Sequence, residues 1–117
     1  MTDAQSNIVT MRRPQAAAGS FDEFWQECPG VMRNRSSKGL TRALWTEITT
    51  NGRDCRVPLK DGGQTVEIIN VHMKATPEEI LAGLQRYIEP HYDPQTFRYD
   101  EFLCGAAVFL NQGRWES

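Results

Sequence analysis

The sequence predicts a small, mainly α-helical domain of four helices, with a β-hairpin inserted at about residues 55–73. Three observations support this prediction. Two Ser/Thr-x-x-Glu capping boxes each precede an amphipathic run, a Val- and Ile-rich stretch follows a Gly-Gly pair, and an apolar stripe at helical spacing occupies the C-terminal region. We expect a single domain over residues 20–117, preceded by a flexible N-terminal tail over residues 1–19.

The composition argues against several classes of protein. The chain has 117 residues, 39% of them hydrophobic, and a net charge of −2. No apolar run approaches the roughly 18 residues that span a bilayer, and the N-terminus lacks the continuous apolar segment of a secretory signal. We therefore expect a cytoplasmic protein without a membrane partner.

The residues that could carry chemistry form no recognisable constellation. Cys28, Cys55 and Cys104 are far apart and form no CxxC pair, which argues against a disulfide framework or a zinc ribbon. His72 and His91 do not stand at ligand spacing from them. Because no nucleophile–base set and no phosphate loop is present either, we expect no enzymatic activity, no metal, no cofactor and no small-molecule substrate.

The first predicted helix begins after Ser20, which forms a capping box with Glu23. Large side chains then recur at positions i, i+3, i+4 and i+7: Phe21, Phe24, Trp25 and Cys28. Pro29 followed by Gly30 ends this helix. Three aromatic rings on two helical turns are typical of a core face.

The second predicted helix follows a basic connector, residues 31–37. Ser36 or Ser37 can cap it, and it runs to about Thr49, before Asn51-Gly52. Its predicted buried stripe consists of Leu40, Leu44 and Ile48, with Trp45 beside it.

Residues 53–74 are β-prone and predict a hairpin with its turn at Gly62-Gly63. Ile68 and Ile69 interrupt the alternation of apolar and polar residues, which predicts either a β-bulge or burial on both faces. A lone two-stranded hairpin is marginal in water, so we expect it to lie against the helices or to pair with a partner.

The third predicted helix has the strongest start signals, with Thr76 as its cap, Pro77 at the first helical position and Glu79 completing a capping box. Pro90 closes it. The last helix is predicted from a stripe at helical spacing: Phe102, Leu103, Ala106, Phe109 and Leu110.

The predicted last helix ends at Asn111 and Gly113, and we expect the other helices to pack around it. Trp115 should then fold back onto the first helix near Phe21 or Trp25. The expected structural anchors are Phe21, Trp25, Trp45, Phe109 and Trp115.

The basic residues suggest an anion-binding patch. Residues 1–60 carry nine Lys/Arg and six Asp/Glu, whereas residues 61–117 carry four and nine, so the halves have net charges of +3 and −5. The candidate nucleic-acid contacts are Arg33, Arg35, Lys38 and Arg42, with Arg12 and Arg13 in the tail. The alternative is that the four residues from Arg33 to Arg42 line a solvated helix face and that the two tail arginines are simply solvated.

Three blocks in this order resemble the C-terminal domain of bacteriophage and prophage replication proteins of the replisome-organiser or helicase-loader type. The blocks are FDEFW-x-x-x-P at residues 21–29, ATPEEILAGL-x-x-YI at residues 75–88 and FLNQGRWES at residues 109–117. The resemblance covers residues 21–117 apart from the hairpin, and only a tail of about 20 residues takes the place of the winged-helix domain that usually precedes this module.

The resemblance implies a phage- or mobile-element-derived accessory module of DNA replication. Such a module would bind DNA weakly and non-specifically through the basic residues, with a salt-dependent affinity, or dock on a replicative helicase. The alternative is a small phage or mobile-element protein that binds a host protein and inhibits or adapts it without contacting DNA, through the hairpin edge or the acidic C-terminal half.

Overall fold

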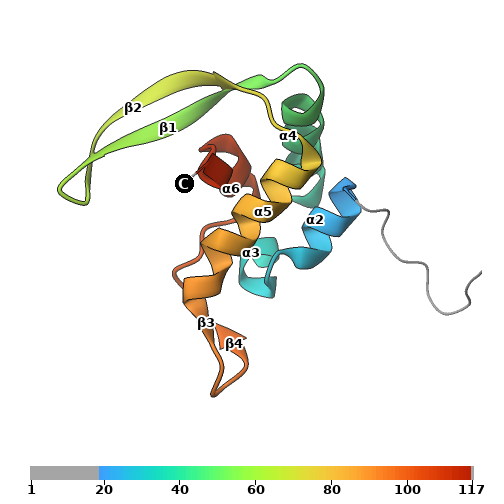
Figure 1. Cartoon of the computed structure of the whole chain (residues 1–117), viewed down its shortest axis with the longest axis vertical. Helices are drawn as coiled ribbons and strands as arrows, with labels where there is room; N and C mark the ends of the chain where they lie inside the picture. The colour runs from blue at the N-terminus through green and yellow to red at the C-terminus, as the bar shows by residue number, and fades with distance from the viewer. Residues whose placement is uncertain (1–18, 117) are drawn as a thin grey trace, which may run out of the picture.

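The computed structural model describes residues 19–116 and has an α+β fold (Figure 1). The described residues form five α-helices and two antiparallel two-stranded sheets. The helices are α2 (Phe21–Glu27), α3 (Gly30–Asn34), α4 (Lys38–Thr50), α5 (Pro77–Ile88) and α6 (Ala106–Asn111). The strands are β1 (Arg53–Asp61), β2 (Gln64–Met73), β3 (Tyr92–Asp93) and β4 (Arg98–Tyr99), and two 3₁₀ turns are η1 (Glu89–His91) and η2 (Arg114–Glu116). The tail predicted at residues 1–19 lies, apart from Gly19, outside the described residues.

The prediction of a mainly α-helical domain of four helices is therefore wrong. The predicted basic connector forms the extra helix α3, and the hairpin strands are 9 and 10 residues long. The last helix has only 6 residues. Neither α3 nor α6 has a side-chain N-cap, and helices this short depend on tertiary packing, which local sequence signals do not report.

The three helices with side-chain caps begin where the sequence predicts. Ser20 Oγ accepts a hydrogen bond from Glu23 N at the start of α2, and Ser37 Oγ accepts one from Leu40 N at the start of α4, both at 3.2 Å. At α5, Thr76 Oγ1 accepts from Glu79 N, and Glu79 Oε1 accepts from Thr76 N at 2.8 Å. Each cap satisfies backbone donors that would otherwise lack partners.

The core is built around aromatic rings contributed by four helices. The Phe24 ring lies 5.2 Å from Trp45 and 6.1 Å from Phe109, and Phe109 lies 5.4 Å from Tyr87 between ring centroids. Of the expected anchors, Phe21, Trp45, Phe109 and Trp115 are buried, and Trp25 is half-buried against the core.

The long hairpin is confirmed, and Figure 1 shows it extending away from the helices. Its two-residue turn requires positive φ at both Gly62 (61°) and Gly63 (83°). The register shift lies opposite Leu59 and Lys60 and leaves Val66 of β2 as the extra residue, so it does not fall at the two isoleucines. The two adjacent isoleucines instead put apolar side chains on both faces of the ribbon.

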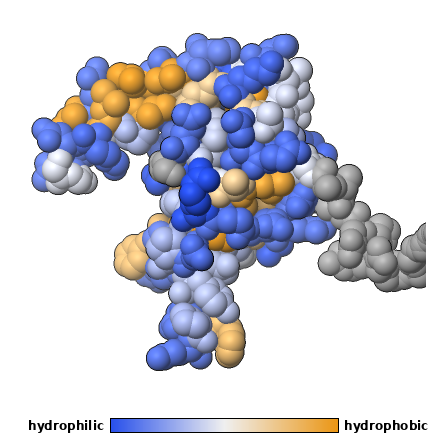
Figure 2. All heavy atoms as spheres, in the orientation of Figure 1, coloured by the Kyte–Doolittle hydropathy of each residue, from blue (hydrophilic) through white to orange (hydrophobic). Residues whose placement is uncertain are grey.

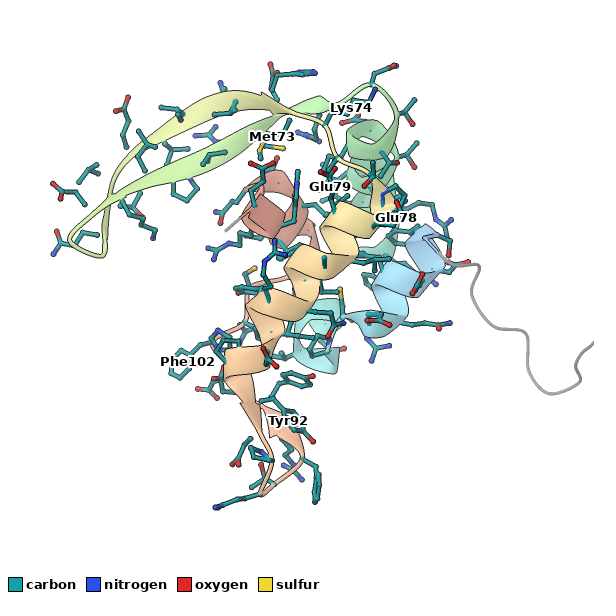
Figure 3. The ribbon with its side chains drawn as sticks, viewed as in Figure 1. Met73, Lys74, Glu78, Glu79, Tyr92 and Phe102 are labelled. Carbon is teal, nitrogen blue, oxygen red and sulfur yellow. The ribbon has the colours of Figure 1, made fainter. Side chains whose placement is uncertain are left out.

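Two apolar residues that helical spacing assigned to buried stripes are exposed. Leu40 on α4 is 55% exposed and Phe102 is 79% exposed. Phe102 precedes α6, because the backbone stays non-helical until Gly105, and its side chain points away from the helices (Figure 3). Leu103, Phe109 and Leu110 are buried as predicted.

Trp115 packs against α5, so its predicted position on the first helix is wrong. Gly83, in the middle of α5, leaves no room for a side chain, because a Cβ there would lie 2.5 Å from Trp115 Cα. Arg86 Nη2 donates a hydrogen bond to Trp115 O at 2.8 Å. A small residue on one helix thus creates the seat for the C-terminal turn η2.

Candidate protein-binding surface

Two of the predicted nucleic-acid contacts cover the aromatic face of α2. Lys38 Nζ lies 5.9 Å from the Trp25 ring centroid, and Arg42 Cζ lies 4.7 Å from that of Phe21. Arg42 also forms an ion pair with Asp22 at 3.5 Å. These cations therefore help to hold α4 against α2, although both remain exposed.

The other two predicted contacts, Arg33 and Arg35, lie at the end of α3. Arg35 Nη1 donates a hydrogen bond to Leu103 O at 2.7 Å, joining α3 to the segment before α6. Arg33 is half-buried, and its charge acts on the thiol of Cys28. The structure thus places the four residues along α3, its C-cap and α4, and gives Arg35, Lys38 and Arg42 contacts within the domain. Arg12 and Arg13 lie outside the described residues.

The long hairpin carries a different surface, which faces the helices. Register pairs Cys55 with Val71 and Val57 with Ile69, and residues directly opposite each other in a sheet share a face. Cys55 is buried against α6, where its Sγ lies 3.6 Å from Leu110 O. Further along this face Val57, Ile69 and Val71 are only half-buried, and Leu59 is 39% exposed. We call this the inner face of the hairpin.

A groove lies between the inner face and the C-terminal turn. It has a volume of about 320 Å³, and its apolar walls include Val57, Val71 and Met73. Gly113 (φ 65°) forms its floor, where a Cβ would lie 2.7 Å from Met73 Cε; Met73 projects from the base of the hairpin (Figure 3). Lys60, Arg114 and Glu116 provide charged atoms at its rim. The space-filling view shows apolar side chains gathered along the hairpin (Figure 2).

This surface was missed at the sequence level, although a signal for it was present. A hairpin with one buried and one solvent-exposed face alternates apolar and polar residues. The sequence of β2 departs from that alternation at Ile68 and Ile69. Such a departure indicates apolar groups on both faces. The sequence does not say how far the helices cover them.

Two of the three cysteines, Cys28 and Cys55, are buried, which disfavours their reactive thiolate form. Burial raises the pKa of Cys28 to about 12, against the opposing charge of Arg33, and burial also raises the pKa of Cys55. Within residues 19–116, no three His, Cys, Asp or Glu side chains converge in a way that could hold a metal ion.

We expect iodoacetamide at pH 8 to modify Cys28 far more slowly in the folded protein than in denaturant. A pKa near 12 instead of 9.0 leaves about a thousand-fold less thiolate. Mass spectrometry of tryptic peptides at timed intervals would measure the rate. Equal rates in the folded and unfolded states would contradict the burial of this thiol.

A cluster of acidic residues near β4 serves the local fold. Asp100 accepts hydrogen bonds from Phe102 N and from the His91 ring, both at 2.9 Å. Desolvation raises the pKa of Asp100, but the two hydrogen bonds and the charge of His91 together outweigh it, and the pKa is lowered. The carboxylate therefore stabilises the segment that leads into α6 through these hydrogen bonds.

No protein-family model, curated protein or solved structure matches this chain. In the part of the chain that the structure describes, no helix combines the length and the apolar character needed to cross a membrane.

Proposed function

We propose that this chain is a protein-binding module, an adaptor or inhibitor, that holds an aliphatic segment of a partner protein in the groove under the hairpin. The observation that supports this most is the groove itself, with its apolar wall of Val57, Val71 and Met73. Leu59, two residues after Val57 and on the same face of β1, is 39% exposed. Burying an exposed aliphatic side chain contributes about 1.5–3 kcal/mol. A partner would gain this free energy, because the fold leaves these side chains uncovered.

The chemistry of the partner follows from the charge of the surroundings. The rim of the groove carries two basic groups, Lys60 and Arg114, beside one acidic group, Glu116. A partner segment with acidic residues beside its aliphatic side chains would be attracted to this rim, mainly through a faster association rate. The sequence resemblance makes a replicative helicase the first candidate partner, with the module of phage or mobile-element origin.

DNA binding is the weaker alternative. Lys38 and Arg42 lie one turn apart on α4 and remain exposed beside Trp25, which is the observation in its favour. However, Arg42 already pairs with Asp22, and Arg35 is bonded to Leu103. We therefore expect little phosphate contact from this face.

The test begins with a photo-crosslinking amino acid placed at Leu59, and at the exposed Ala43 on α4 as a control site. We expect position 59 to crosslink to one protein, with the purified replicative helicase tried first, and position 43 not to. With that protein, Leu59→Asp should weaken the affinity at least about ten-fold, or 1.4 kcal/mol. Asn70→Asp adds the same charge on the opposite face of the ribbon and should change the affinity less than about two-fold.

Two results would contradict this proposal. In the first, Leu59→Asp would bind the crosslinked protein as tightly as the unaltered chain does. In the second, fluorescence anisotropy with labelled single- and double-stranded oligonucleotides would reveal binding that weakens steeply with salt. If the triple variant Arg35→Ala, Lys38→Ala, Arg42→Ala abolished that binding, the nucleic-acid function would replace the protein-binding one.

A further inference from the structure

The two edges of the long hairpin differ in their exposure. The helices α4 and α6 pack on β1, so β2 is the outer strand of the ribbon (Figure 1). Within the described residues, the sheet consists of these two strands alone. The outer edge of β2 therefore presents backbone N–H and C=O groups that no strand pairs with.

The edge of β1 contains a proline and three basic residues, and the edge of β2 contains no proline, lysine or arginine. Pro58 has no backbone N–H to donate. The register shift at Leu59 and Lys60 leaves Val66 as an extra residue on β2, so the regularly paired part of β2 runs from Glu67 to Met73. A contact between two β1 strands centred on Pro58 would also oppose Arg56 to Lys60. In contrast, β2 contains no proline and only one residue of formal charge, Glu67.

The outer strand is also apolar where it extends past the helices. Val66 is 63% exposed and Ile68 is 51% exposed. An isolated two-stranded ribbon is marginal in water, and three or more strands are needed for independent stability. The distal half of this hairpin has no third strand in the described chain.

We propose that β2 pairs antiparallel with β2 of a second copy of this chain, giving a four-stranded sheet across a twofold axis. A twofold axis perpendicular to the sheet leaves the two faces of the sheet unexchanged. Two residues that pair across the axis therefore point to the same face, and their residue numbers differ by an even number. An axis through Glu67 would oppose the two Glu67 carboxylates, so we place the axis at Ile68 or Ile69, in the middle of β2. In both registers Glu67 faces an aliphatic residue, Ile69 or Val71, and not the second Glu67. Self-pairing therefore brings no like charges together.

The paired sheet would place the two grooves on the same side. This follows because the axis preserves the inner face of each hairpin, and each groove lies under its own inner face. A dimer of this kind would present two aliphatic sites to one partner or to two. The dimer would form through the edge of β2 and not through the groove, so dimerisation and the proposed function can be tested independently of each other.

The test is the mass of the full chain in solution, measured by light scattering and by sedimentation over about 1 μM to 1 mM. We expect the mass to rise with concentration from 13.3 kDa toward twice that value. The double variant Val66→Lys, Ile68→Lys places lysines on facing edges and should remain a monomer. The matched variant Leu59→Lys, Asp61→Asn raises the charge equally on β1 and should dimerise as the unaltered chain does.

Circular dichroism of both variants would verify that they fold. Hydrogen exchange adds a second readout, since amides of β2 should become protected at high concentration while those of α4 do not change. A monomeric mass at all concentrations would overturn the proposal. Dimerisation that survives in the Val66→Lys, Ile68→Lys variant would overturn it as well.

Discussion

Gly83→Ala is expected to destabilise the protein, although the same change in an ordinary helix is stabilising. Alanine exceeds glycine by about 1 kcal/mol in helix propensity, but the new Cβ would lie 2.5 Å from Trp115 Cα and 2.6 Å from Trp115 Cβ. These are backbone-linked atoms that cannot rotate away, so η2 must shift from α5. Overpacking of this kind costs about 1–3 kcal/mol, and the hydrogen bond from Arg86 to Trp115 O would be lost as well.

The matched control is Gly39→Ala, in the first turn of α4. A Cβ at that position meets nothing closer than Ser37 Oγ at 3.9 Å, so only the backbone effect remains. We expect this variant to be more stable by about 0.5–1 kcal/mol. Urea denaturation followed by circular dichroism would give both values. If Gly83→Ala proved as stabilising as Gly39→Ala, Trp115 could not be seated on α5 as described.

The sequence predicted those elements whose signals are local. The caps Ser20, Ser37 and Thr76 lie within three residues of the backbone groups that they satisfy, and the turn at Gly62-Gly63 needs only its own two residues. Such elements can be recognised in one sequence because the chemistry and its partner are neighbours in the chain.

The elements that were predicted incorrectly depend on distant contacts. The seat of Trp115 is Gly83, 32 positions away in the chain, and glycine in a helix gives no indication of what fills the space beside it. The candidate binding surfaces also depend on contacts between residues that are far apart in the chain. The basic residues could be picked out from their spacing, but the bond from Arg35 to Leu103 joins residues 68 positions apart. Likewise, the groove depends on Met73 meeting Gly113.

Phe109→Ala and Phe102→Ala should have opposite outcomes, although helical spacing assigned both residues to one buried stripe. Phe109 is fully buried between the rings of Phe24 and Tyr87, and truncating such a ring costs about 3–5 kcal/mol. Phe102 is 79% exposed, so its truncation should change the free energy of unfolding by less than about 0.5 kcal/mol.

The loss expected for Phe109→Ala is a large part of the roughly 5–15 kcal/mol that stabilises a small domain, so this variant could be unfolded at room temperature. Phe109→Leu keeps most of the apolar volume and gives a measurable intermediate, with an expected loss of about 1–2 kcal/mol. The ranking in urea midpoint should therefore be Phe102→Ala, Phe109→Leu, Phe109→Ala from highest to lowest. If Phe102→Ala fell to the midpoint of Phe109→Leu, the segment before Gly105 would have to be helical and packed, and α6 would begin earlier than Ala106.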